Sequence, residues 1–233
     1  IQALKGLEAV RKRPAMYIGD TGTQGLHHLV WEILDNSIDE AMAGHADHIR
    51  INVHADGEGI SIEDNGRGIP VGMHPTEKIP TLQLVLTALH AGGKFGGSGY
   101  AASGGLHGVG ASCVNALSTE MTATVRRDGG VHEMKFSRGE VTQQISKTRD
   151  MKRGESTGTR IEFRPDIEIF KNGVEFNEKT LLNRFREAAF LNRGLTIEYS
   201  NEKTGTKVNF QFNGGIADYV DYLAENRSNN YPT

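Results

Sequence analysis

Residues 25–44 read Gly25-Leu-His-His-Leu-Val-Trp-Glu-Ile-Leu-Asp-Asn-Ser-Ile-Asp-Glu-Ala-Met-Ala-Gly44, a stretch that combines a strong helical period with several polar residues. Its apolar residues recur at steps of three and four, which is the pattern of an amphipathic helix. They are Leu29, Ile33, Leu34, Ile38, Ala41 and Met42. Gly44 provides a stop signal. The stretch therefore predicts one long helix that turns an apolar stripe toward a core.

Three polar residues of the same helix follow one another at steps of four. His28, Glu32 and Asn36 should form a column beside the apolar stripe. An imidazole, a carboxylate and a carboxamide in such a column suit a hydrated metal ion and a water molecule that must lose a proton. For the helix taken alone, an ordinary solvated face is the simpler interpretation, because charged residues are common on surface helices.

The composition limits the classes of protein to consider. The chain has 233 residues, 37% of them hydrophobic and 24% charged, which fits one sizeable domain or one domain with the start of a second. A net charge of -3 argues against a module whose main task is nucleic-acid binding. Cys113 is the only cysteine, and the sequence contains neither a long apolar run nor a signal-peptide pattern at Ile1. We therefore expect a soluble cytoplasmic protein without membrane contact.

On both sides of the central helix, helical and extended patterns alternate. Residues 1–13 predict a short helix that ends at Pro14, and its basic run Arg11–Arg13 could bind phosphate but more simply stays solvated. The later segments predict a hairpin over 49–62, helices over 80–91 and 111–117, strands over 122–127, 131–137, 141–147 and 159–165, a helix over 177–192, a hairpin over 195–212 and a helix over 216–226.

Glycine dominates residues 91–110, AGGKFGGSGYAASGGLHGVG, directly before a predicted helix. Backbone N–H groups at the start of a helix suit a phosphate chain, although a glycine-rich stretch alone is more often a flexible loop. The segment is not a Walker loop, because Gly93-Lys94 is followed by Phe95. Its last glycines have the spacing G-x-x-G-x-G, so the dinucleotide fingerprint fails as well.

The order of four motifs along the chain is more specific than any one of them. A helix with Glu32 and Asn36 is followed by Asp64-Asn-Gly-Arg-Gly68 at a strand end, by Gly105-Leu-His-Gly-Val-Gly110, and by Thr157-Gly-Thr159 at a strand start. This order resembles the ATPases of the gyrase, heat-shock chaperone, histidine kinase and mismatch-repair superfamily. More narrowly, five segments resemble the B subunits of bacterial type IIA topoisomerases, gyrase and topoisomerase IV. They are LEAVRKRPAMYIGD, GLHHLVWEILDNSIDEAMAG, EDNGRGIPVGMHP, LHAGGKFGGSGYAASGGLHGVGASCVNALS and STGTRIEFRP, which together span most of the chain.

The resemblance implies an α+β fold, a two-layer sandwich in which helices cover one face of a mixed eight-stranded sheet, known as the Bergerat ATP-binding fold. It implies an ATP-binding domain over residues 1–213 and the start of a transducer domain over 214–233. An arm that reaches into a partner subunit would then lie before Ile1, and a lysine that contacts the terminal phosphate would lie after Thr233.

The resemblance also assigns roles to single residues. Glu32 corresponds to the general base, His28 to the histidine that orients it, and Asn36 to the magnesium ligand. Asp64 corresponds to the acceptor of the adenine amino group, and Thr159 to a hydroxyl that completes this contact through water. The other implied ATP-binding residues are Arg67 and Gly68 near the base, and Lys94, Leu106, His107, Gly108, Val109 and Gly110 in a phosphate-binding lid. Pro70 and Arg127 correspond to the rim of the inhibitor pocket, with Arg126 as a rival in register for Arg127.

The implied activity is ATP hydrolysis by part of a DNA topoisomerase, an isomerase and antibiotic target that uses ATP and Mg²⁺. The implied partners are an A-type topoisomerase subunit, DNA, a second copy of the protein upon ATP binding, and aminocoumarin-type inhibitors. An ATP-gated clamp of the chaperone or mismatch-repair families is the alternative. The segments LEAVRKRPAMYIGD and DNGRGIPVGMHP favour the topoisomerases.

Overall fold

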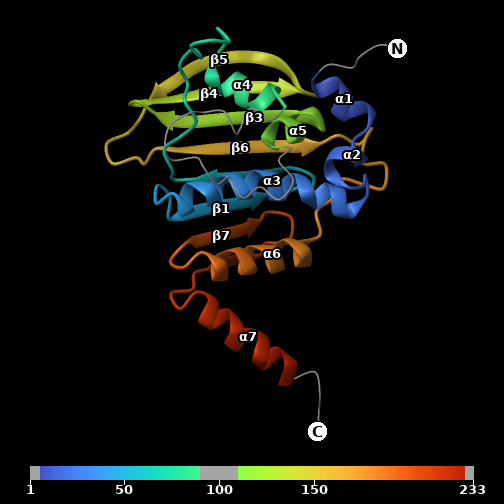
Figure 1. Cartoon of the computed structure of the whole chain (residues 1–233), viewed down its shortest axis with the longest axis vertical. Helices are drawn as coiled ribbons and strands as arrows, with labels where there is room; N and C mark the ends of the chain where they lie inside the picture. The colour runs from blue at the N-terminus through green and yellow to red at the C-terminus, as the bar shows by residue number, and fades with distance from the viewer. Residues whose placement is uncertain (1–5, 90–109, 229–233) are drawn as a thin grey trace.

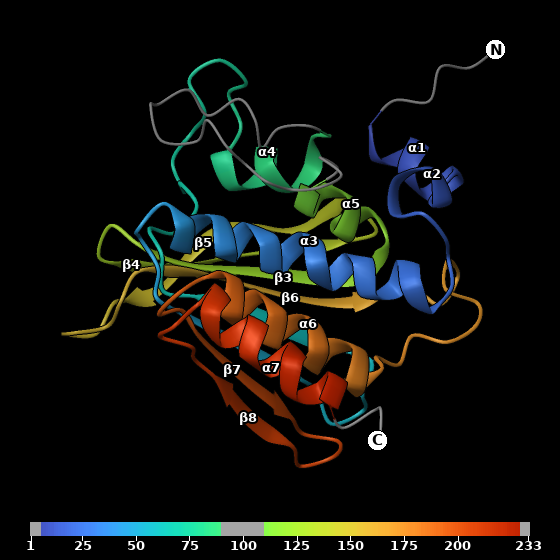
Figure 2. The same ribbon diagram turned by 60° about the horizontal axis from the view of Figure 1, so that its bottom comes forward.

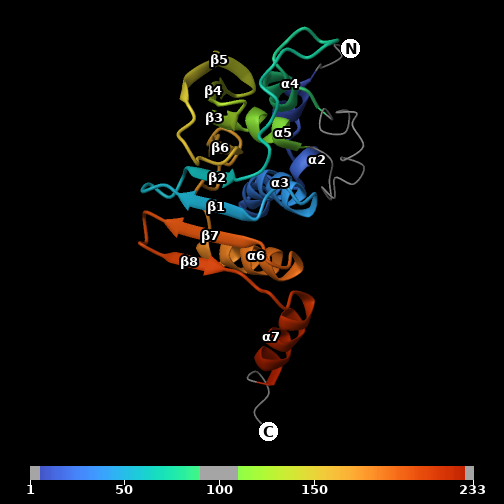
Figure 3. The same cartoon turned by 90° about the vertical axis from the view of Figure 1, so that its left-hand side faces the viewer.

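The computed structural model describes residues 6–89 and 110–228, in which eight strands form one mixed sheet with helices on one face (Figures 1 and 3). The strands are β1 (His48–Val53), β2 (Ile60–Asp64), β3 (Ser118–Arg127), β4 (Gly130–Ser137), β5 (Glu140–Asp150), β6 (Gly158–Pro165), β7 (Thr196–Asn201) and β8 (Lys207–Phe210). The helices are α1 (Leu7–Lys12), α2 (Ala15–Ile18), α3 (Thr23–Met42), α4 (Thr81–Thr87), α5 (Gly110–Ala116), α6 (Glu178–Leu191) and α7 (Ile216–Ser228). The predicted α+β sandwich is confirmed.

The order of strands across the sheet is β5-β4-β3-β6-β2-β1-β7-β8. Neighbouring strands are antiparallel except for β1 and β7, which run parallel with Ile49 opposite Ile197. This parallel pair joins the N-terminal hairpin to the C-terminal hairpin and makes the sheet mixed.

The two faces of the sheet differ in polarity because side chains alternate along each strand. Ile49, Ile51 and Val53 of β1 are buried in the hydrophobic core under the helices. The residues between them, Arg50 and Asn52, belong to the other face, which we call the open face. Glu63, Arg126, Arg160 and Glu198 also belong to the open face.

Helix α3 lies between α5 and α6 across the covered face (Figure 2). Leu29, Ile33, Leu34 and Ile38 of its apolar stripe are buried, as predicted from the three- and four-residue spacing. The prediction is wrong for the last residue, Met42, which is 70% exposed, and Ala41 is only half-buried. Asp20 accepts hydrogen bonds from the amides of Gly22 and Gly25, both at 2.8 Å, and so fixes the first turn. The helix begins two residues before the predicted start at Gly25 and ends at Met42, with Gly44 following in the left-handed region.

The basic run in α1 is not simply solvated. Arg11 bonds the carbonyl of Ala116 at 2.8 Å and the carboxylate of Asp166 at 2.9 Å. Arg138 bonds the same carboxylate at 2.8 Å, and Asp166 is fully buried. This ion-pair cluster ties α1 to the sheet, so the solvated interpretation is wrong for Arg11, whereas Arg13 is exposed.

Helix α7 projects away from the sheet after Gly214 and Gly215 (Figure 1). Its Tyr219 and Tyr222 rings pack on Phe190 of α6 at centroid distances of 5.1 and 5.5 Å. The domain boundary between residues 213 and 214 stays a prediction. None of the helices within 6–89 and 110–228 has the length and hydropathy needed to cross a membrane.

Candidate functional site

Glu32 lies in the middle of α3 with both carboxylate oxygens engaged. Nε2 of His28 lies 3.0 Å from Oε1, and the backbone N–H of Gly110 donates to Oε2 at 2.9 Å. The Glu32 side chain is 10% exposed. A carboxylate oriented in this way, at the edge of solvent, can act as a base toward a water molecule.

Gly110 is the one predicted lid residue that the structure describes. It is the first residue of α5 and adopts a positive φ of 73°. Its Glu32 bond brings the end of the glycine-rich segment to the middle of α3. The other predicted lid residues, Lys94, Leu106, His107, Gly108 and Val109, lie outside the described residues.

Asn36 follows Glu32 by one helical turn and is exposed. Its carboxamide makes no hydrogen bond to any residue within the described ranges. No group of three His, Cys, Asp or Glu side chains in those ranges could hold a metal ion. Mg²⁺ commonly takes one or two protein oxygens and completes its shell with phosphate oxygens and water. An exposed carboxamide oxygen beside a carboxylate fits that kind of site.

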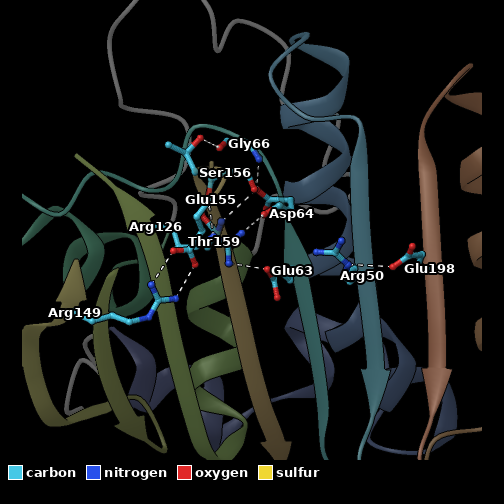
Figure 4. Close-up of polar contacts among 11 residues, drawn as sticks. Arg50, Glu63, Asp64, Gly66, Arg126, Arg149, Glu155, Ser156, Thr159 and Glu198 are labelled. Carbon is cyan, nitrogen blue, oxygen red and sulfur yellow. Dashed lines mark hydrogen bonds and ion pairs between the residues drawn. The ribbon is translucent and has the colours of Figure 1, made fainter. Parts of the chain in front are cut away.

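Asp64 ends β2 with its side chain on the covered face, where it is 6% exposed. Its carboxylate accepts three hydrogen bonds. Oδ1 accepts from the amides of Gly66 and Thr159 at 2.9 and 3.3 Å (Figure 4). Oδ2 accepts from the Ser37 hydroxyl at 3.1 Å. Burial raises the pKa of Asp64 to about 6 although these bonds oppose the shift. The group is therefore an anionic acceptor near neutral pH, suited to a ligand N–H donor.

The Asp64–Gly68 and Thr157–Thr159 motifs meet beside this carboxylate. Thr157 donates its hydroxyl to the carbonyl of Gly66 at 2.6 Å, and the Thr159 hydroxyl accepts from the amide of Ile69 at 3.2 Å. Gly68 has a positive φ of 75°, and a Cβ there would lie 2.9 Å from the Arg126 carbonyl. Glycine therefore allows the turn to pass close to β3.

The predicted rim residues surround the loop that follows. Arg127 donates from Nη1 to the carbonyl of Gly68 at 2.7 Å, and Pro70 is exposed nearby in the chain. The Arg67 side chain forms a two-pronged ion pair with Glu40, with distances of 3.1 and 2.7 Å. Arg126, the rival for Arg127, bonds Glu63 instead. Of the two arginine side chains, that of Arg127 is thus the one that bonds the carbonyl of Gly68.

Two partners of the site were not assigned a role from the sequence. Ser37 bonds Asp64, and Glu40 holds Arg67. A signal for Ser37 was present, since a hydroxyl four residues after Ile33 occupies a position on the apolar stripe. Glu40 gave no comparable signal, because a glutamate near the end of a helix is ordinary.

A hollow of about 600 Å³ lies elsewhere, on the open face. Its lining includes Arg50 and Glu198, which form an ion pair across neighbouring strands. Two further charged residues line it, Glu63, which pairs with Arg126, and Arg160, which pairs with Glu162. The hollow offers no excess of one charge, and it lies on the opposite face from the Asp64 carboxylate. The candidate site is therefore the one on α3.

Helix α3 brings all of these groups together, because Ser37 reaches Asp64 from the same helix that carries Glu32 and Asn36. A nearly buried carboxylate, an exposed carboxamide and a buried acceptor around one helix, on a sheet of this strand order, place the chain in the class of α+β ATP-binding domains.

Comparison with known proteins gives the family. The chain belongs to the histidine kinase-, DNA gyrase B-, and HSP90-like ATPases, whose family model matches residues 21–169. The DNA gyrase B protein of Haloferax volcanii is 54% identical over 229 residues, which cover 98% of this chain and 36% of the relative. The DNA gyrase B protein of Clostridium acetobutylicum is 50% identical over 227 residues, covering 97% of this chain and 35% of the relative.

A solved structure shows the same fold. The 43K ATPase domain of Thermus thermophilus gyrase B, crystallised in complex with an aminocoumarin, has a TM-score of 0.85 and 44% sequence identity. The match covers 95% of this chain and 56% of that one. The chain spans about a third of the length of the curated relatives named above.

Proposed function

We propose that the chain is the ATP-binding and ATP-hydrolysing part of a gyrase B-type DNA topoisomerase. ATP binding would bring two copies of the whole protein together, and hydrolysis would be coupled to the passage of one DNA segment through another. The observation that carries the hydrolytic part is the Glu32 carboxylate, held by His28 and Gly110 beside the exposed Asn36 carboxamide. The similarity to gyrase B proteins over nearly the whole chain supports the topoisomerase assignment.

In this proposal Glu32 takes a proton from the water that attacks the terminal phosphate, and the His28 contact keeps the carboxylate turned toward that water. Asn36 holds Mg²⁺, which supplies positive charge to the phosphate oxygens. Lys94 and residues 106–110 contact the phosphate chain. The three groups on α3 thus serve the reacting end of the nucleotide.

Asp64 serves the other end by accepting a hydrogen bond from the adenine amino group. Guanine presents a carbonyl oxygen at that position, which would face a buried anion without a proton between them. Thr159 completes the contact through water, while Arg67 and Gly68 flank the base. The raised but still acidic pKa of Asp64 keeps the acceptor ionised at neutral pH.

The remaining assignments concern the whole protein. We propose an A-type topoisomerase subunit and DNA as partners, the cytoplasm as the compartment, and residues 214–233 as the start of a transducer domain. The aminocoumarin bound to the Thermus thermophilus domain suggests that Pro70 and Arg127 form the rim of an inhibitor site in this chain too.

A supercoiling assay with the whole protein and its A-type partner tests the proposal. We expect an ATP-dependent change in DNA linking number that is lost in Glu32→Ala. ATP-dependent dimerisation without any change in linking number would instead support the clamp of the chaperone or mismatch-repair families.

A further inference from the structure

Arg126 of β3 joins three segments of the fold from the open face of the sheet. Its Nε donates to the Ser156 carbonyl at 2.8 Å, Nη1 to the Glu63 carboxylate at 2.6 Å, and Nη2 to the backbone carbonyl of Asp64 at 3.4 Å (Figure 4). One guanidinium therefore fixes the end of β2 and the loop before β6 against β3.

This contact lies behind the base-recognition group. The carboxylate of Asp64 faces the helices, whereas its backbone carbonyl receives the Arg126 bond from the open face. Arg126 also fixes Ser156, three residues before Thr159, whose amide donates to the same carboxylate. It thereby holds both the residue that carries the acceptor and the segment that supplies one of its donors.

Gly158 makes the contact possible. A Cβ at this position would collide with the Asp64 carbonyl oxygen and would come within 2.6 Å of Nη2 of Arg126. The missing side chain leaves room for the guanidinium to approach the main chain. The glycine of the Thr157–Thr159 motif thus leaves room for the Arg126 side chain in addition to its role in the turn.

Arg126 differs from its neighbours on the open face. Its side chain is 11% exposed, compared with 60% for Arg50, which pairs with Glu198, and 44% for Arg149, which pairs with Glu155. Exposed ion pairs of that kind contribute little to the free energy of unfolding. The Arg126 guanidinium is planar, nearly buried, and donates to one carboxylate and two carbonyls. A lysine cannot reproduce this geometry, because its ammonium is a compact point charge.

We propose that Arg126 is a positioning residue for adenine recognition, which holds the Asp64 carboxylate in place from the opposite face of the sheet without touching the nucleotide. The proposal rests on the adenine contact of Asp64. It predicts that loss of Arg126 weakens only the part of nucleotide binding that depends on the adenine amino group.

The test compares the affinities for ATP and for purine riboside triphosphate, which has the same phosphates but no 6-amino group. Arg126→Ala should weaken ATP binding by about two- to tenfold and leave the analogue nearly unchanged, as expected for a misplaced hydrogen-bond acceptor. Arg126→Lys should have the same effect on the two affinities while keeping a positive charge beside Glu63. It can replace the alanine variant in the test if that variant does not fold. Arg50→Ala is the matched control, and both affinities should stay unchanged.

The same measurements in an Asp64→Asn background separate the two claims. If Arg126 acts through Asp64, removing it from this background should cost no further ATP affinity. An additive loss, or an equal loss for both nucleotides, would show that Arg126 is a general structural residue and would overturn the proposal. If Asp64→Asn alone leaves ATP affinity unchanged, the adenine contact itself is wrong.

Discussion

The backbone N–H of Gly110 donates a 2.9 Å hydrogen bond to the carboxylate of Glu32, 78 positions earlier in the chain. Because His28 approaches the other oxygen of the same carboxylate at 3.0 Å, both oxygens are oriented before any nucleotide binds. The end of the glycine-rich segment is thereby connected directly to the proposed base.

Glu32→Ala should lower ATP hydrolysis by the whole protein about 10²–10⁴-fold, the usual effect of losing an acid–base group. ATP binding should be nearly unchanged, since Glu32 acts on the water. Calorimetric binding and phosphate release from one preparation measure both effects. Glu120→Ala, on the exposed part of β3, is the control, and hydrolysis retained in Glu32→Ala would refute the assignment.

Asn36→Ala should weaken magnesium-dependent binding of an ATP analogue more than binding of an inhibitor confined to the adenine pocket. Only the phosphate chain needs the metal, and the exposed carboxamide supports no described neighbour. Titrations of both ligands with and without Mg²⁺ provide the comparison. Equal losses for the two ligands would mean that Asn36 shapes the pocket instead.

Asp64→Asn should reduce ATP affinity by roughly 1–3 kcal/mol, or about 5- to 150-fold. The carboxamide can still accept from Gly66, and the Ser37 hydroxyl can rotate to accept from the new NH₂ group, so the fold should tolerate the change. The adenine amine would then face a second donor. ATP and GTP titrations together with thermal unfolding test this, and an unchanged ATP affinity would leave Asp64 with a role in the turn only.

The stability of the domain should depend on pH through Asp64. Its native pKa of about 6 lies above the ordinary value of 3.8, so between these values the native state holds a proton that the unfolded state has released. The contribution of Asp64 to the free energy of unfolding should therefore decrease as pH rises through this window, by about 3 kcal/mol in total. Urea unfolding from pH 4 to 7 should show this trend as a difference between the wild type and Asp64→Asn. Parallel curves for the two proteins would contradict it.

Asp166→Asn should lower the free energy of unfolding by about 1.5–3 kcal/mol, because Arg11 and Arg138 lose charge-assisted hydrogen bonds to a buried partner. Burial alone would raise the pKa of Asp166, but bonds from the Glu168 amide, Arg138 and Arg11 lower it, so the group is ionised at neutral pH. Arg149→Ala breaks an exposed pair and should change the free energy of unfolding much less than Asp166→Asn does. Similar losses in both variants would argue against a special role of the cluster.

Local periodicity predicted the helices and strands well. The spacing of Leu29, Ile33 and Ile38 indicated α3, and the alternation of Ile49, Ile51 and Val53 indicated β1. Periodicity carries no information on which strands become neighbours, so the parallel pairing of β1 with β7 did not follow from it. The mixed character of the sheet came from the family resemblance alone.

For the candidate site, too, local spacing was predictable from the sequence, whereas burial and long-range contacts were not. Helical spacing placed His28, Glu32 and Asn36 in one column, but it could not show that Glu32 is nearly buried while Asn36 is exposed. Glu32 also bonds the amide of Gly110, 78 positions later, and the helical spacing carries no information on such a long-range contact. The bond from Ser37 to Asp64 likewise joins groups 27 positions apart and depends on how α3 lies on the sheet.

The parallel pairing of β1 with β7 has a consequence for the time course of folding. β1 lies inside the sheet, yet one of its two neighbours, residues 196–201, is made nearly 150 positions later. Closing so long a loop is entropically costly, and pairings of this kind slow folding. During synthesis on the ribosome, one edge of β1 must therefore stay unpaired until the C-terminal hairpin has emerged, which leaves this edge open to chaperone binding or misassembly in the nascent chain.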